Sequence, residues 1–213
     1  MQKLIIILTT CFLGGYSNAQ TVSDKDGNEY TVITMEKQEW LDANLNTTHF
    51  ENGDEIKQAM SQEEWDKAYE SKTPVWCWPD FAETGDNACG RLYNLWAVVD
   101  ERDLFPSDWR LPSGDEWQYL IEETLGGWEN VAEAKSTEDW ETPGTNETGL
   151  NFLPCKSDFS IGQESIFWTS DAGYTDETKT AIWTNSYMID NESFNGGTGP
   201  ASHAMYVRCV RTP

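Results

Sequence analysis

The sequence predicts an α+β fold, with helices in the first half of the chain and a loop-rich sheet after them. Capping-box spacing indicates two helices before residue 130, and short strands separated by Pro, Gly, Thr and Asn follow. Eleven Trp, eight Tyr and eight Phe predict an aromatic core, although the mean hydropathy is −0.62. Disordered chains are poor in aromatic residues, so we expect a folded domain.

The first half of the chain contains a hairpin and the predicted helices. Residues 21–34 form a hairpin, because a polar turn cluster precedes a β-branched run. Ser61 and Ser113 each stand before a helix with Glu three residues later, and the second helix ends at Gly126 and Gly127. Residues 90–99 carry Leu, Trp and Val at helical spacing, which predicts a buried helix.

Short strands are predicted beyond residue 130. They cover residues 152–153, 166–169, 181–184, 187–189 and 205–210. The mature chain has no internal repeat and no linker long enough to divide it. Residues 21–213 are therefore predicted to form a single domain.

Residues 1–19 have the pattern of a cleavable signal peptide. Lys3 forms a positive n-region, an apolar run covers residues 4 to about 13, and residues 17–19 are a small-residue cleavage site. The run is too short to span a bilayer, which takes about 20 apolar residues. We expect cleavage near Ala19 and a protein that is secreted or held in the cell envelope, with no transmembrane segment.

Acidic side chains far outnumber basic ones. Removing Lys3 with the leader leaves 13 of the 14 Lys and Arg against 37 Asp and Glu, which changes the net charge from −23 to −24. Nucleic acids and anionic membranes are bound through clusters of Lys and Arg, so this balance excludes both as partners. The charge reflects either solubility outside the cell or bound divalent cations.

Four cysteines, Cys77, Cys89, Cys155 and Cys209, remain once Cys11 leaves with the leader. An even number in an exported chain predicts two disulfides, for which three pairings exist. We favour Cys77 with Cys89, which closes a short loop, and Cys155 with Cys209, which ties the C-terminal strand to the body. A zinc site is not expected, because no C-x-x-C motif occurs and both histidines are distant from any cysteine in the sequence.

Five motifs occur in order along nearly the whole mature chain. They are Asp26-Gly-Asn-Glu-Tyr30, Gln38-Glu-Trp-Leu-Asp-Ala-Asn-Leu45, Gly90-Arg-Leu-Tyr-Asn94, Pro106-Ser-Asp-Trp-Arg-Leu-Pro112 and Val207-Arg-Cys-Val-Arg211. On these motifs the chain resembles the Fibrobacter succinogenes major paralogous domain, a family of exported bacterial proteins. Residues 110–117 and the terminal Arg-Cys-Val-Arg are also similar to elements of the formylglycine-generating enzyme superfamily.

The resemblance implies a C-type-lectin-like fold. Such a fold has two helices, a small antiparallel sheet in which the N- and C-terminal strands pair, and a long loop region. Many relatives carry a cysteine before the Pro-x-x-Trp element, where this chain has Phe105. Cys209 then needs another partner, which also favours Cys155.

No catalytic centre is expected. Copper-dependent oxidases of the formylglycine-generating group use two closely spaced C-terminal cysteines, whereas Cys209 stands alone in that region. Neither His49 nor His203 lies near a nucleophile motif such as G-x-S-x-G, so a serine hydrolase is not supported. Acidic pairs are abundant, which keeps a carboxylate-dependent glycosidase as an alternative.

Aromatic side chains are the first candidates for ligand binding. Trp76, Trp78 and Phe81 form a dense patch, and Trp168 and Trp183 belong to predicted strands. Exposed rings of this kind stack on sugars or contact proteins. Packing in the core is the other interpretation.

Oxygen-bearing side chains are candidates for holding Ca²⁺. Asp171, Asp176, Asp190 and Asn191 lie in two polar loop segments and supply the hard ligands that calcium prefers. The Glu-Pro-Asn and Trp-Asn-Asp triplets of calcium-dependent lectins do not occur, and solvated polar loops are the other interpretation. No cofactor besides Ca²⁺ is indicated.

These observations predict a non-catalytic binding module, secreted or on the cell surface. It recognises a glycan or an extracellular protein through its loop-rich half, from about residue 136 to residue 200. The alternatives are a secreted carboxylate-dependent enzyme acting on glycans and a structural envelope protein. The sequence does not indicate an oligomeric state.

Overall fold

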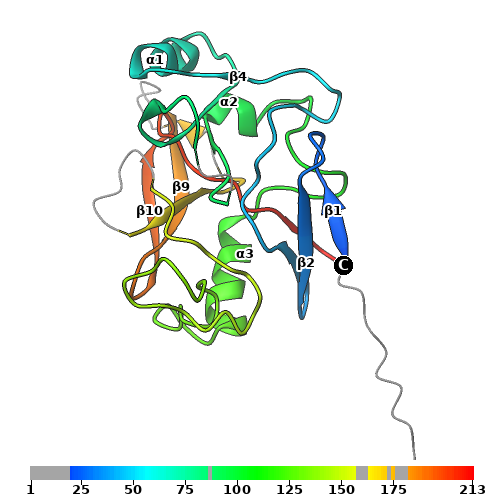
Figure 1. Ribbon diagram of the computed structural model, residues 1–213, viewed down its shortest axis with the longest axis vertical. Helices are drawn as coiled ribbons and strands as arrows, with labels where there is room; N and C mark the ends of the chain where they lie inside the picture. The colour runs from blue at the N-terminus through cyan, green and yellow to red at the C-terminus, as the bar shows by residue number, and fades with distance from the viewer. Residues whose placement is uncertain (1–19, 86–87, 157–162, 172–173, 176–181) are drawn as a thin grey trace, which may run out of the picture.

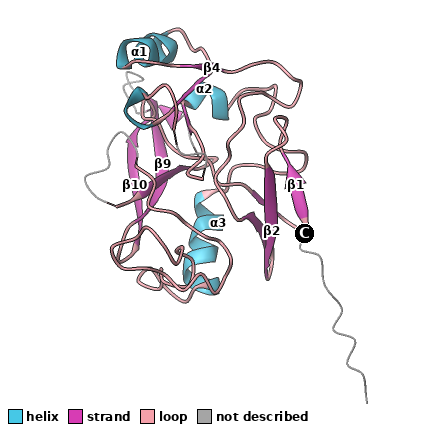
Figure 2. Ribbon diagram, viewed as in Figure 1, coloured by secondary structure: helices cyan, strands magenta, loops and turns pink. Residues whose placement is uncertain are grey.

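Short helices and three small sheets make up the described part of the protein, a computed structural model shown in Figures 1 and 2. The structure describes residues 20–85, 88–156, 163–171, 174–175 and 182–213. The mixture of helices and antiparallel sheets confirms the predicted α+β class. The predicted signal peptide lies outside the described residues.

One sheet, here called the terminal sheet, brings the N- and C-terminal strands together. Its strands, in spatial order, are β1 (Thr21–Ser23), β2 (Glu29–Met35), β3 (Gln38–Leu41) and β11 (Val210–Arg211). All pairs are antiparallel, and Val210 lies opposite Trp40. The predicted hairpin is confirmed. The C-terminal strand β11 pairs with β3, whereas the first strand, β1, lies at the opposite edge of the sheet.

A second sheet has three short strands, and the first helix of the chain connects two of them. It consists of β4 (Lys57–Gln58), β5 (Val75–Cys77) and β6 (Leu92–Tyr93), and α1 (Gln62–Glu70) connects β4 to β5. The Ser61 hydroxyl accepts the Glu64 N–H at 3.2 Å. The predicted N-cap of this helix is confirmed.

The predicted buried helix over residues 90–99 is wrong in extent. Residues 92–93 form β6, and only the single turn α2 (Leu95–Val98) is helical. Asn94 divides the two elements, because its side-chain oxygen accepts the N–H of Val75 on β5 and that of Ala97 in α2, at 3.1 and 3.0 Å. Because Asn94 caps α2 and also bonds the neighbouring strand β5, β6 ends and α2 begins at this residue.

Helix α3 (Gly114–Tyr119) continues through a π-helical turn, Leu120–Thr124. The predicted capping box is present: the Ser113 hydroxyl accepts the Glu116 N–H at 3.2 Å, and the Glu116 carboxylate accepts the Ser113 N–H at 2.9 Å. The chain leaves the helix at Gly126, whose φ of 78° is accessible to glycine at little cost. Start and end both agree with the prediction.

A third sheet, here called the hairpin sheet, forms in the loop-rich half. Its strands are β7 (Ser165–Trp168), β8 (Tyr174–Thr175), β9 (Ile182–Ile189) and β10 (Phe194–Pro200); β9 pairs antiparallel with the other three. The strand predicted at 166–169 is confirmed, and those predicted at 181–184 and 187–189 belong to one strand. Figure 1 shows this sheet in orange and red on the left, the terminal sheet on the right and α3 between them.

Two segments differ from the predicted strands. Phe152 forms only an isolated bridge with Lys135, and most of residues 205–210 are extended with single bridges, so that β11 is only two residues long. The glycine-rich strand β10 was not predicted, because glycine is a poor strand former. Hydrogen bonds from two backbone N–H groups to the Asp190 side chain close the turn before β10 and bring this segment beside β9.

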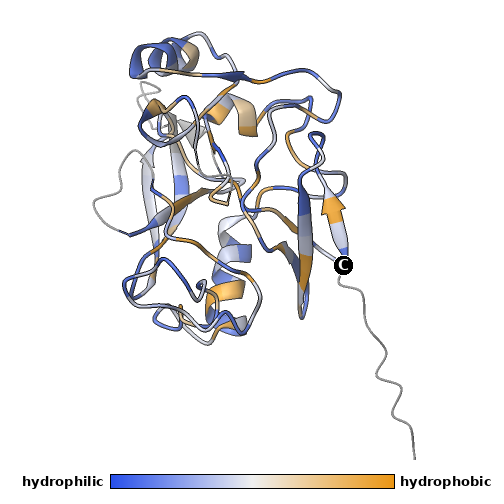
Figure 3. Cartoon of the chain, viewed as in Figure 1, coloured by the Kyte–Doolittle hydropathy of each residue, from blue (hydrophilic) through white to orange (hydrophobic). Residues whose placement is uncertain are grey.

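The tryptophans supply much of the core. Eight are buried, at positions 40, 65, 76, 78, 109, 117, 140 and 168. Trp117 is fully buried at the centre, where its ring contacts those of Trp40 and Tyr187 at centroid distances of 4.9 and 5.5 Å. Figure 3 shows hydrophobic segments in β2 and in the π-helical turn that follows α3, whereas α1 is largely hydrophilic. The aromatic core predicted from composition is confirmed.

The predicted disulfide pairing is wrong. Cys89 and Cys155 are bonded to each other, while Cys77 and Cys209 are buried thiols outside that bond. The two thiols lie in different packing clusters, and Cys209 shares its cluster with Phe105. Phe105 therefore belongs to the same part of the core as Cys209.

No helix in the described ranges is both long and apolar enough to cross a membrane.

Candidate ligand-binding groove

An open groove with a volume of about 260 Å³ lies between the start of α3 and strands β9 and β10 of the hairpin sheet. Its lining comes from the start of α3, from β9 and from β10: Gly114, Asn185, Ser186, Tyr187, Gly196, Gly197 and Thr198. Tyr187 is the only ionisable residue in this set. We call it the hairpin groove, and it lies in the half of the chain predicted to bind ligand.

Polar atoms in the hairpin groove retain unused hydrogen-bonding capacity. The side-chain oxygen of Asn185 accepts the Thr198 hydroxyl at 3.1 Å, which directs the amide without occupying its two N–H donors. The Tyr187 hydroxyl donates to the Gly114 carbonyl at 3.1 Å, so its lone pairs can still accept. The groove therefore offers a fixed amide donor and a fixed hydroxyl acceptor.

A row of aromatic rings supports the groove from inside. Tyr187 stacks on Trp117 on one side and on Trp128 on the other, with an interplanar angle of 14° in both pairs. Trp117 is buried, Trp128 is half-buried, and the Trp128 indole N–H donates to Glu122 at 3.1 Å. The row fixes the position of Tyr187 and leaves the Trp128 ring partly accessible.

Two glycines of β10 leave the strand without projecting side chains at the groove. A Cβ at Gly197 would meet no atom within 4 Å, and one at Gly196 would only touch Tyr187 and Trp128 at ordinary contact distances. The packing therefore tolerates a side chain at both positions. Their absence leaves the groove open.

The predicted aromatic candidates lie mostly in the core. Trp76 and Trp78 are buried and pack edge to face, and the Arg91 guanidinium lies 4.5 and 4.9 Å from the centroids of the two rings. Trp168 is fully buried and donates its indole N–H to the Tyr93 carbonyl at 2.9 Å. These three rings cannot contact a ligand from solvent, and core packing accounts for them.

The remaining two aromatic candidates have different positions. Phe81 is half-buried and packs against Trp65 at a centroid distance of 6.2 Å. Trp183 lies in β9 opposite Pro200, and its side chain is outside the described part of the structure. Phe81 does not line the hairpin groove.

The predicted calcium ligands serve other partners. Asp171 accepts the N–H of Gly114 at 2.9 Å. Asp190 accepts the N–H groups of Glu192 and Ser193, both at 2.8 Å, and so closes the β9–β10 turn. These carboxylates hold backbone, and Asp176 lies outside the described residues.

Asn191, the fourth predicted ligand, already faces a cation. Its carbonyl accepts the Lys135 ammonium at 2.8 Å, and its side-chain oxygen accepts the Thr142 N–H at 3.1 Å. Across the described ranges, no three His, Cys, Asp or Glu residues are grouped so that they could hold a metal ion.

Comparison with family models decides the classification. A model described as the Fibrobacter succinogenes major domain matches residues 33–211. The chain belongs to this family. The matched range includes both helical caps, the whole hairpin sheet and β11, and it confirms the resemblance drawn from the sequence motifs.

Comparisons with curated proteins and with solved structures found no match.

Sequence reasoning missed the residues that line the groove of this Fibrobacter succinogenes major domain. Asn185 and Tyr187 are two residues apart on β9, so they share a face of the strand. That alternation was a usable signal, but the interval between the two predicted strands hid it. The Gly-Gly-Thr-Gly run of β10 gave no signal beyond that of a loop.

Proposed function

We propose that this protein is a non-catalytic binding module that recognises a neutral glycan in the hairpin groove. One observation carries the proposal: an open groove in which an amide donor, a phenolic acceptor and a hydroxyl lie beside a partly accessible indole ring. Sugars present hydroxyls around an apolar ring face, and this combination is complementary to them.

The absence of large exposed anchors on β10 favours a glycan over a protein ligand. Energetically dominant residues in protein interfaces are mostly Trp, Tyr and Arg. The most exposed stretch of β10 is Gly196–Thr198, and its groove is slightly smaller than typical sites for drug-sized molecules. A small hydroxylated ligand fits this surface better.

Binding without catalysis is supported by the chemistry of the lining. A glycosidase needs two carboxyl groups on either side of the bond that breaks. Among the described residues, none that lines the hairpin groove carries a carboxyl group, an imidazole or a thiol. A carboxylate-dependent enzyme is therefore the alternative that the glycan experiment below must distinguish.

We also infer a C-type-lectin-like fold and a location outside the cytoplasm. Support for the fold comes from the pairing of β3 with β11, the two capped helices and the long irregular stretch between α3 and β7. Support for export comes from the signal-peptide pattern of residues 1–19. A secreted or envelope-bound glycan receptor combines both inferences.

A glycan array probed with the mature protein tests the proposal, once with calcium and once with chelator. We expect binding to a neutral glycan that persists in chelator, because no carboxylate is found among the described lining residues and the nearby Asp171 already accepts the Gly114 N–H. Gly196→Trp places a ring over Tyr187 and Trp128, because a Cβ at this position contacts both. It should lower the affinity at least about ten-fold, which is about 1.4 kcal/mol. Asn185→Ala should also weaken binding.

Glu192→Trp is the matched control, since it adds the same ring at an exposed position of the same hairpin outside the groove. It should leave the affinity unchanged. Hydrolysis of a bound glycan would favour the enzyme. Absence of binding to any glycan, or equal binding by Gly196→Trp, would overturn the proposal.

A further inference from the structure

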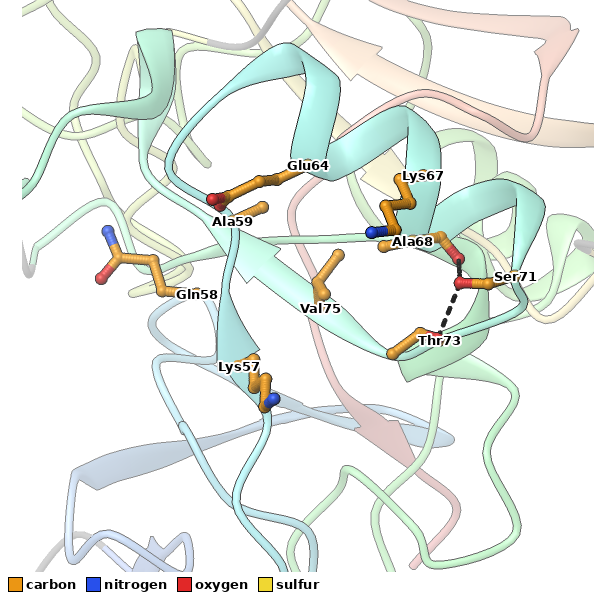
Figure 4. Close-up of a pocket in the computed structure, with 9 residues that line it drawn as sticks. All are labelled: Lys57, Gln58, Ala59, Glu64, Lys67, Ala68, Ser71, Thr73 and Val75. Carbon is orange, nitrogen blue, oxygen red and sulfur yellow. Dashed lines mark hydrogen bonds between the residues drawn. The ribbon is translucent and has the colours of Figure 1, made fainter.

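Helix α1 and strands β4 and β5 enclose a second groove, here called the α1 groove (Figure 4). Its volume is about 390 Å³, which falls within the range of small-molecule sites. Ala59, Ala68 and Val75 form a buried apolar floor. None of these residues contributes to the hairpin groove.

Two ammonium groups border the α1 groove. Lys67 projects from α1 and Lys57 from β4, and in the view of Figure 4 Val75 lies between them. Both lysines are exposed, and neither has a carboxylate partner within 4.0 Å among the described residues. Unpaired cations at one groove are notable in a chain with 37 acidic residues.

The acidic residue of the α1 groove is turned away from this pair. Glu64 accepts the backbone N–H of Met60 at 2.8 Å, a contact that holds its carboxylate at the start of the helix. Figure 4 shows that carboxylate beside Ala59, at the other end of the groove from Lys67. The charge facing the Val75 end is therefore positive.

Hydroxyl groups complete the positive end. Ser71 and Thr73 both line the α1 groove, and their hydroxyl oxygens are 2.8 Å apart (Figure 4). The Ser71 hydroxyl also donates to the Ala68 carbonyl at 3.3 Å, so both O–H donors are engaged. The remaining lone pairs can accept from the hydroxyl groups of a ligand. Cations, hydroxyls and an apolar floor are thus combined within one groove.

We infer that the α1 groove binds a small hydroxylated carboxylate, of the sugar-acid class. Its carboxylate is held by Lys57 and Lys67, its hydroxyl groups face Ser71 and Thr73, and its body covers Val75. A polyanion is disfavoured because the net charge of −23 repels it at long range. A single carboxylate responds mainly to charges within a Debye length of about 8 Å.

Titration of the full mature chain with sodium galacturonate, followed by amide NMR shifts, tests this inference. We expect saturable shifts at Lys57, Thr73 and Val75, and none with the uncharged methyl ester of the same sugar acid. Exposed ion pairs are weak, so Lys57→Gln and Lys67→Gln should each lower the affinity about two- to five-fold. Added salt should lower it as well.

Lys25→Gln is the matched control, because it removes one exposed positive charge outside the groove. It should leave the affinity unchanged, and so should Gly196→Trp in the hairpin groove. Equal shifts with the methyl ester, a loss in Lys25→Gln as large as in Lys67→Gln, or no saturable shifts at the groove amides would overturn the inference. The same spectra show whether each variant is folded.

Discussion

Two hairpins in this protein, β1–β2 and β9–β10, are each closed by an aspartate. Asp24 accepts hydrogen bonds from two backbone N–H groups, from the Asn28 amide and from the Tyr30 hydroxyl, the last at 2.6 Å. Asp190 accepts from two backbone N–H groups and from the Asn195 amide at 3.1 Å. Both turns thus rely on the same local chemistry.

The faces of the two hairpins differ. Alternate residues of β2 are buried, and the Tyr30 hydroxyl accepts the Asn46 N–H at 2.9 Å, which attaches this hairpin to a distant segment. On β10 only Phe194 is buried, and residues 196–198 are exposed. The first hairpin is therefore part of the core, whereas the second presents a surface. The same type of turn closes both hairpins. The side chains of the strands decide whether a hairpin packs into the core or presents a surface.

Trp117 is the point at which the two sheets depend on each other. Trp117→Ala removes a fully buried ring that contacts Trp40 of the terminal sheet and Tyr187 of the hairpin sheet. We expect the free energy of unfolding to fall by about 3–5 kcal/mol, measured by urea denaturation. The half-buried Trp128 is the control, and Trp128→Ala should cost clearly less. Equal losses would show that the sheets are not coupled through Trp117.

The two turn aspartates allow a direct comparison. Asp24→Ala removes a buried acceptor and leaves Tyr30 without its partner, so we expect a loss of about 2–3 kcal/mol in the free energy of unfolding. Asp190→Ala acts on a more exposed turn, and its loss should be about 1 kcal/mol. Urea denaturation measures both. A larger loss for Asp190→Ala would reverse our ranking of the hairpins.

Acid should weaken the first hairpin through Asp26. Partial burial raises the pKa of this carboxyl group, but hydrogen bonds from Thr48 and His49 outweigh that effect and hold the pKa below its usual value. A lowered folded-state pKa means that the stabilisation is present above the unfolded pKa of 3.8 and is lost as the pH falls through the lower folded value.

Denaturation at several pH values between 5 and about 2 measures this contribution. The free energy of unfolding should depend less steeply on pH in Asp26→Asn than in the wild-type chain. Asp108→Asn is a control at another exposed aspartate with no hydrogen bond or ion pair in the described structure. Parallel pH curves for Asp26→Asn and the wild type would contradict the prediction.

Features set by neighbouring residues were predictable from the sequence. The caps at Ser61 and Ser113 and the turn before β2 each depend on contacts within four residues, and all three were predicted. Asn94 marks the limit of this reasoning. Its cap is local, but its bond to Val75 on β5 is not, and that bond divides the predicted helix into a strand and a single turn.

Features set by long-range packing were not predictable. Cys89 and Cys155 are 66 residues apart and meet only in the folded chain, so sequence proximity favoured the wrong partner for Cys89. The hairpin groove depends on the position of α3 beside β9, which no local pattern specifies. The tryptophans show the same limit, because composition predicts an aromatic core without saying which rings remain accessible.

Chemical labelling of the two cysteines outside the disulfide can report local opening of the protein. Burial raises the pKa of the Cys209 thiol, and both Cys77 and Cys209 are inaccessible, so an alkylating reagent can reach either only when its surroundings open. Cys77 lies in the cluster around Trp117, and Cys209 lies in the cluster around Tyr93. Labelling rates at the two sulfur atoms therefore measure the opening of the two halves of the core separately, without any engineered probe.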